Sequence, residues 1–203
     1  TAFFAAVKAA GGKPIEIPVV GDYEIDEEMI KSKITEKTRM IIVNTPNNPT
    51  GGVLEKNSLK AIAEIAHEHD LLVLSDEIYE RLTYEGEEAW SVASFEGMKE
   101  RTIMVNGFSK TYAMTGWRLG YAVANEEIIE AMTRIQQATT SCPSSFVQKA
   151  SIAALRGPQE CVDEMLKEYD RRRKIIIRRL NDLDGVECPV AKGAFYVFPS
   201  FTG

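Results

Sequence analysis

The chain has 203 residues, and its 24 lysines and arginines face 30 aspartates and glutamates, which gives a net charge of −6. The negative balance argues against a protein that binds nucleic-acid backbones, and no apolar run approaches the length needed to span a bilayer. The length suits one large domain with a sizeable core, so we expect a globular protein with neither nucleic-acid nor membrane partners.

Helix and strand patterns alternate over the first part of the chain. Gly11 and Gly12 end the first helix, and Asp26 is a good N-cap for the second. The expected order is a helix over 2–10, a strand over 14–19, a helix after Asp26, a strand over 39–43, a helix over 56–69, and strands over 71–75, 102–105 and 120–124. The strands are nearly continuous apolar runs, which predicts a three-layer α/β/α fold with a mostly parallel sheet.

The pattern becomes helical from about residue 126. Further helices are expected over 144–156 and 159–183, and the last of them carries the basic run "RRRK" (171–174). Acidic residues precede this run, so we interpret it as a solvated helix face and not as a nucleic-acid patch. The segment "AFYVFPSF" (194–201) is expected to be a strand, which predicts the start of a second domain.

Metal and redox chemistry find little support in the sequence. The three cysteines, Cys142, Cys161 and Cys188, have no CxxC spacing and are typical of reduced thiols in a cytoplasmic protein. His67 and His69 are two residues apart and so do not share a helix face. We therefore expect no metal site and a cytoplasmic location.

Polar clusters follow three of the predicted strands. They are "NTPNNPTGG" (44–52), "DEIYE" (76–80) and "NGFSK" (106–110). In open parallel sheets, ligands bind outside the carboxyl ends of the strands. Each side chain taken alone also has an ordinary structural role available to it as a cap, a turn former or a surface ion-pair partner. If the strands are parallel, these clusters bring six polar groups to one edge: Asn48, Asp76, Tyr79, Ser109, Lys110 and, a little further on, Arg118.

These residue types together match one ligand chemistry. A hydroxyl and an arginine suit a phosphate, and a lysine suits a Schiff base with a carbonyl group. A carboxylate suits a cationic ring nitrogen, whereas a phenol and an amide suit a ring oxygen. Pyridoxal phosphate carries all four groups.

The segments "NTPNNPTGG", "SDEIYE" and "NGFSKTYAMTGWRLGY" resemble the signature segments of fold-type I, pyridoxal-phosphate-dependent aminotransferases of class I/II. The resemblance is to the aspartate aminotransferase-like branch, it covers essentially the whole chain, and "GAFYVFPSF" resembles the first strand of that family's small domain. It implies a central fragment with residues 1–140 in the cofactor-binding large domain, 141–185 in interdomain and small-domain helices, and 186–203 in the first strand of an incomplete small α+β domain.

The resemblance also implies catalytic roles for three residues. Lys110 would form the Schiff base and move a proton between substrate and cofactor. Asp76 would pair with the pyridinium nitrogen and keep the ring an electron sink. Tyr79 would hydrogen-bond the 3-oxygen of the ring.

Four further residues would bind the cofactor. Asn48 would share the 3-oxygen with Tyr79, and Ile78 would pack on one face of the ring. Ser109 and Arg118 would bind the phosphate. The Asn48–Pro49 bond is expected to be cis, which would aim the amide inward.

The implied reaction moves an amino group between an L-amino acid and a 2-oxo acid, in a homodimer. The family's N-terminal phosphate turn and its substrate-carboxylate arginine have no counterpart in these residues, so we expect this piece alone to be inactive. Two alternatives remain open from the sequence: a C–S β-lyase of the same fold, and a non-catalytic domain that binds pyridoxal phosphate. Neither GxGxxG nor GK[ST] occurs, which argues against an ordinary nucleotide-binding domain.

Overall fold

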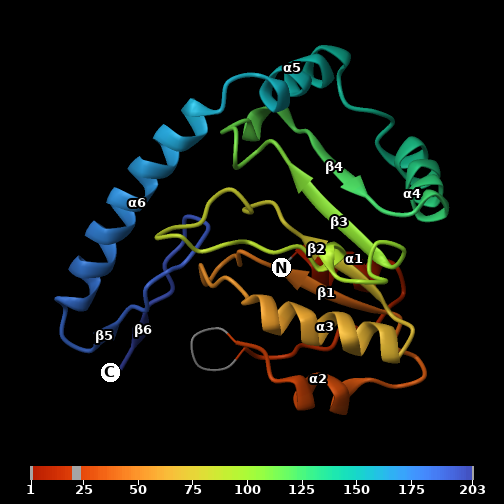
Figure 1. The fold of residues 1–203 in the computed structure, drawn as a ribbon, viewed down its shortest axis with the longest axis horizontal. Coiled ribbons are helices and arrows are strands. Elements are labelled where there is room, and N and C mark those ends of the chain that lie inside the picture. Colours follow the sequence, from red (N-terminus) through yellow and green to blue (C-terminus); the bar gives the residue numbers. More distant parts are fainter. Residues whose placement is uncertain (1, 20–23, 203) are drawn as a thin grey trace.

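A four-stranded sheet forms the centre of the molecule (Figure 1). The computed structural model describes residues 2–19 and 24–202. The strands are β1 (Met40–Asn44), β2 (Leu72–Asp76), β3 (Thr102–Gly107) and β4 (Gly120–Val123), in the order β1-β2-β3-β4. The first three are parallel, as the alternating pattern predicted, and β4 runs antiparallel to β3. No long helical crossover separates β3 from β4, and a parallel pair requires one.

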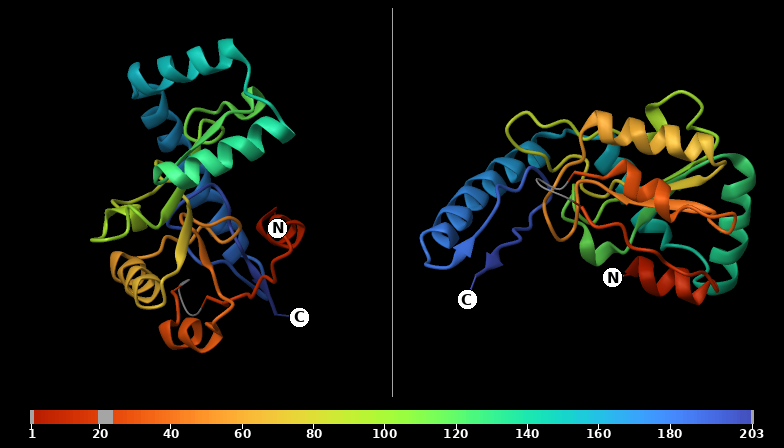
Figure 2. Two further views of the ribbon diagram at one scale, coloured as in Figure 1. Left: turned by 90° about the vertical axis from the view of Figure 1, so that its right-hand side faces the viewer. Right: turned by 90° about the horizontal axis from the view of Figure 1, so that it is seen from below.

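Helices pack around the sheet, and the last three α-helices follow its final strand along the chain. They are α1 (Ala2–Ala9), α2 (Glu27–Lys33), α3 (Lys56–Glu68), α4 (Glu126–Thr139), α5 (Ser145–Arg156) and α6 (Glu160–Asn181), with short 3₁₀ turns η1 (Val92–Ser94) and η2 (Thr115–Trp117). Helices α1 and α3 lie on opposite faces of the sheet (Figure 2). None of the helices in the described ranges is both long enough and apolar enough to cross a membrane.

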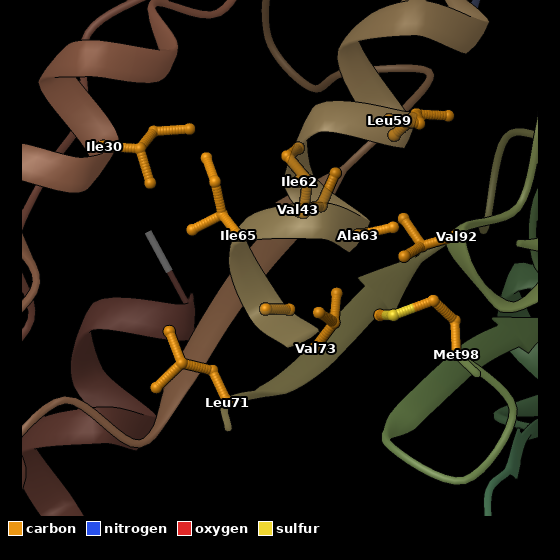
Figure 3. Close-up of a cluster of buried hydrophobic side chains, with 11 residues drawn as sticks. Ile30, Val43, Leu59, Ile62, Ala63, Ile65, Leu71, Val73, Val92 and Met98 are labelled. Carbon is orange, nitrogen blue, oxygen red and sulfur yellow. The ribbon is translucent and has the colours of Figure 1, made fainter. Parts of the chain in front are cut away.

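The main hydrophobic core lies between α3 and one face of the sheet (Figure 3). Leu59, Ile62 and Ala66 recur at helical spacing along α3, and at most 2% of each is exposed. They pack in one cluster with Val73 of β2, and Ile30 of α2 joins it from outside. Asp26 caps α2 as expected, because its carboxylate accepts a hydrogen bond of 3.0 Å from the Met29 amide.

Two strands expected from the sequence are wrong. Residues 14–19 form no strand, and two prolines there, Pro14 and Pro18, remove backbone donors that a sheet needs. The expected strand over 194–201 shortens to β6 (Ser200–Phe201), which pairs with β5 (Val186–Glu187). The backbone around Ala194 instead bonds to the loop after β2, since the Ala194 amide donates to the Leu82 carbonyl oxygen over 2.8 Å.

The basic run on α6 divides into two environments. Arg171 and Arg172 are exposed and pair with Glu168, as a solvated face predicts. Arg173 is buried, donates to the Ala191 carbonyl oxygen over 2.7 Å, and places its guanidinium 4.6 Å from the ring centroid of Tyr84. The interpretation of the whole run as solvated is therefore wrong for Arg173, which ties α6 to the chain segment that follows it.

Candidate active site

The carboxyl ends of β1, β2 and β3 lie side by side. The strand register pairs Asn44 with Asp76, and Asp76 with Val105. The Asn44 side chain strengthens this edge: its amide nitrogen donates to the Asp76 carbonyl oxygen over 3.2 Å, and its amide oxygen accepts from the Asn48 backbone over 3.0 Å. The polar clusters predicted to converge therefore begin at one edge of the sheet.

The loop after β1 carries two cis peptide bonds. The Asn48–Pro49 bond is cis, as expected from the sequence, and the Thr45–Pro46 bond is also cis, which was not expected. The buried Thr45 hydroxyl accepts a hydrogen bond of 2.9 Å from the Leu54 amide, so the loop is fastened at both of its ends. Asn48 itself is exposed.

Asp76 is a half-buried carboxylate at the end of β2. Burial raises the pKa of Asp76, and a hydrogen bond of 3.3 Å from the Ile78 amide opposes this in part. No ion pair involves Asp76 within residues 2–19 and 24–202. A cation placed against this group would lower its pKa and gain from the pairing.

Tyr79 follows three residues later, and only 2% of it is exposed. Its hydroxyl lies 2.6 Å from that of Tyr196. Burial is the main reason that the pKa of Tyr79 rises far above the ordinary phenol range, with contributions from Tyr196 and Asp76, while the neighbouring Asn48 side chain lowers it. Tyr79 is therefore a neutral phenol near pH 7.

Lys110 faces this aromatic group. Its Nζ lies 5.8 Å from the ring centroid of Tyr79 and 5.5 Å from that of Phe195, within the range of a cation–π contact. It forms no ion pair with any residue that the structure describes. An amine in such surroundings is free to react once it is deprotonated.

Close packing of the strands brings Ile78 against the end of β3. Gly107 pairs with Gly120 of β4, and a Cβ atom at Gly107 would lie 3.0 Å from the Gly120 Cα. The same Cβ would lie 3.2 Å from Cδ1 of Ile78. The glycine thus lets the loop after β2 approach β3.

Ser109 and Arg118 belong to one compact loop, held by Thr115. The Thr115 hydroxyl donates to the Ser109 carbonyl oxygen over 2.9 Å, and the Arg118 guanidinium donates to the Thr115 carbonyl oxygen over 2.8 Å. Arg118 is exposed and has a left-handed backbone (φ 55°). The structure places both residues near Lys110 along the chain, and their joint binding of a phosphate stays a prediction.

Sequence reasoning missed two residues at this site, Phe195 and Tyr196. Phe195 packs edge-on against Tyr79, with ring centroids 5.4 Å apart, and Tyr196 bonds the Tyr79 hydroxyl. The only local signal for these two residues is a glycine shortly before a pair of aromatic residues. This pattern is equally typical of an ordinary strand. Their approach to Tyr79 depends on a contact across 117 residues of chain.

A second acidic residue, Glu77, is buried next to Asp76. Its carboxylate accepts hydrogen bonds from the hydroxyls of Ser75 (2.8 Å) and Ser91 (2.7 Å), and 6% of the residue is exposed. Burial raises the pKa of Glu77, the two serines lower it in part, and the carboxylates of Glu80 and Asp76 raise it further. The folded state therefore holds a proton here at pH values where the unfolded chain has released it.

This raised pKa predicts a pH dependence of stability. Between the ordinary carboxyl pKa and the raised pKa of Glu77, the native state binds more protons than the unfolded state, so the free energy of unfolding falls as pH rises. Glu77→Gln is expected to flatten this part of the curve, as measured by urea denaturation at a series of pH values. Glu64→Gln on the exposed side of α3 is the control. An unchanged slope in Glu77→Gln would contradict the prediction.

The described residues contain no group of three or more histidine, cysteine or acidic side chains that could hold a metal ion.

Comparison with known proteins identifies the family. The family model described as aminotransferase class I and II matches residues 2–203. The chain is 49% identical to the aromatic-amino-acid aminotransferase 2 of Thermococcus litoralis over 96% of its own length and 51% of that protein. It is 50% identical to the aspartate aminotransferase of Pyrococcus abyssi, again over 96% of this chain and 51% of that protein. The chain thus spans about half the length of the curated relatives it matches.

Solved structures agree with this result. The aromatic aminotransferase of Pyrococcus horikoshii has a TM-score of 0.95 at 48% identity, with 98% of this chain and 54% of that chain covered. The aspartate aminotransferase of Rhizobium meliloti has a TM-score of 0.96 at 38% identity, with 99% and 51% covered. The α/β fold expected from the sequence is confirmed, and the chain belongs to the class I and II aminotransferase family.

Proposed function

We propose that the edge of the sheet binds pyridoxal phosphate and that the protein uses it to move an amino group between an L-amino acid and a 2-oxo acid of the aspartate or aromatic type. The observation that carries this proposal is that two charged groups lie at the same edge of the sheet and that neither has a partner of opposite charge among the described residues. Asp76 is a half-buried carboxylate without a cation, and Lys110 is an amine without a carboxylate, among the described residues. A ligand with a cationic ring nitrogen and an aldehyde would satisfy both.

Each residue then has a chemical task. Bound pyridoxal phosphate would supply an aldehyde that takes up amino groups and a ring that withdraws electrons. Lys110 would hold the aldehyde as a Schiff base and, once released, act as the base that moves the substrate Cα proton. Asp76 would hold the positive charge on the ring nitrogen. Catalytic roles thus fall to Lys110, Asp76 and Tyr79.

The other residues would orient the cofactor. The neutral phenol of Tyr79 would donate a hydrogen bond to the 3-oxygen, together with the Asn48 amide. Ile78 would pack against the ring, and Ser109 with Arg118 would bind the phosphate, for which an arginine is a suitable partner. This proposal includes the division of the chain into a cofactor-binding part (1–140), interdomain helices (141–185) and the start of a small domain (186–203).

The proposal also covers location and assembly. We infer a cytoplasmic protein that acts as a homodimer. Apolar side chains on β4, α4 and α5 support association, since Val123, Ile135 and Phe146 are each more than half exposed. The relatives named above are aminotransferases, which favours transamination over C–S elimination or a non-catalytic role.

A chemical trapping experiment tests the proposal. The whole protein, of which these residues form the described part, is mixed with pyridoxal phosphate and reduced with borohydride, and the modified peptide is mapped by mass spectrometry; the same protein is used in all the assays below. We expect one stable adduct on Lys110. Formation of 2-oxo acids from a panel of amino acids then separates transamination from elimination, which would release ammonia.

A further inference from the structure

The two phenols of Tyr79 and Tyr196 share one hydrogen bond. Their oxygens lie 2.6 Å apart, and either hydroxyl can donate. Tyr79 stands in the loop after β2, and Tyr196 stands in the segment that leads to β6. A phenol has a single proton, so only one of the pair donates in this bond, and the other keeps its proton for a different acceptor.

The aromatic surroundings hold this geometry. Phe195 contacts both tyrosine rings, with centroids 5.4 Å from Tyr79 and 4.8 Å from Tyr196. The Tyr79 and Tyr196 rings meet edge to face at 5.6 Å. Lys110 completes the group from the loop after β3, because its Nζ lies near the rings of both Tyr79 and Phe195. Rotation of either phenol is therefore restricted by packing on several sides.

The segment that carries Tyr196 is anchored independently of this bond. The Ala194 amide donates to the Leu82 carbonyl oxygen over 2.8 Å, and the Tyr84 hydroxyl donates to the Ala194 carbonyl oxygen. Loss of the Tyr196 hydroxyl therefore removes the hydrogen bond to Tyr79, while the ring contact and these two anchors stay in place. This separation makes the role of Tyr196 testable.

We propose that Tyr196 is a positioning residue: when the 3-oxygen of pyridoxal phosphate accepts the hydrogen bond from Tyr79, the Tyr196 hydroxyl becomes the donor to the Tyr79 oxygen and holds the Tyr79 hydroxyl toward the 3-oxygen. The inference rests on the proposed function of the site. A hydroxyl whose oxygen already accepts a hydrogen bond is a stronger donor, because linked hydrogen bonds polarise one another. The segment that follows α6 would thereby act on the cofactor site through Tyr79.

A spectroscopic titration tests this role. The measured quantity is the pH midpoint of the visible absorbance of pyridoxal phosphate bound at Lys110. A donor to the 3-oxygen stabilises its anionic form and keeps this midpoint low. Tyr79→Phe is expected to raise the midpoint by about one pH unit, and Tyr196→Phe by about half a unit, since it weakens the same bond without removing it.

A double variant separates positioning from a general structural effect. If Tyr196 acts through Tyr79, then Tyr196→Phe adds less than about 0.2 pH units when Tyr79 is already phenylalanine. Tyr84→Phe is the matched control, because it removes a hydroxyl that holds the same segment through Ala194 and not through Tyr79. We expect it to leave the midpoint unchanged.

Two results would overturn the inference alone. One is an unshifted midpoint in Tyr196→Phe while borohydride still gives the Lys110 adduct. The other is an equal shift in Tyr84→Phe, which would assign the effect to a loosened segment. Absence of any adduct in the unaltered protein would instead reject the proposed function, and the inference with it.

Discussion

Replacing Lys110 by alanine is expected to abolish the borohydride-trapped adduct and to lower the rate of amino transfer by about 10³-fold or more. The reason is positional: among the described residues, Lys110 is the amine that packs against Tyr79 and Phe195 at this edge of the sheet. No other lysine in the described part of the chain is placed over these two rings, so none is expected to take over both the covalent bond and the proton transfer.

Two variants sharpen this experiment. Lys110→Arg keeps the positive charge but cannot form a stable imine, so it should lose the adduct as completely as alanine. Lys99→Ala removes an exposed lysine at the turn before β3 and should retain both the adduct and the rate. An adduct that survives in Lys110→Ala at full yield would show that another lysine carries the cofactor.

Replacing Asp76 by asparagine is expected to reduce kcat on the order of 10²-fold or more while weakening cofactor binding by less than about tenfold. Asparagine has nearly the same shape and can still accept the hydrogen bond from the Ile78 amide. It has no negative charge, so it cannot hold a proton on the ring nitrogen when charge develops during the reaction. The loss should therefore appear in turnover and not mainly in affinity.

The measurement separates these two quantities. Cofactor affinity is obtained by fluorescence or absorbance titration, and kcat at saturating cofactor and substrate. Asp70→Asn is the control, since Asp70 is an exposed acid on the loop before β2 with a left-handed backbone (φ 50°) that asparagine tolerates. Equal losses of affinity and turnover in Asp76→Asn would count against its pairing with the ring nitrogen.

Local patterns in the sequence were sufficient to predict most of the helices and strands. The stripe of Leu59, Ile62 and Ala66 predicted α3 and its buried face, and Asp26 predicted the start of α2. Such signals act over one or two helical turns, so they can be read without knowing the fold. The prolines within 14–19 are also local, and greater weight on them would have excluded a strand there.

Burial along α6 is a case in which local sequence patterns do not predict correctly which residues face inward. Along 159–183 the helical spacing of apolar residues predicts an inward face that includes Val162 and Ile176. Val162 is buried, but Ile176 is 45% exposed, and Ile177 is buried instead. Arg173 occupies the inward position of the previous turn because the Ala191 carbonyl oxygen and Asp170 satisfy its guanidinium. A charged residue is buried only where partners exist, and one of these partners, the Ala191 carbonyl oxygen, comes from outside the helix.

For the candidate site, the sequence by itself determined which residues stand at the ends of three strands, and the parallel alternation predicted that they meet. Only the tertiary structure decided that Phe195 lies against Tyr79 and that Tyr196 bonds its hydroxyl. Hydrophobic period, caps and turns are properties of neighbouring residues. A contact between residues 117 positions apart follows instead from how whole elements pack, and no local period encodes it.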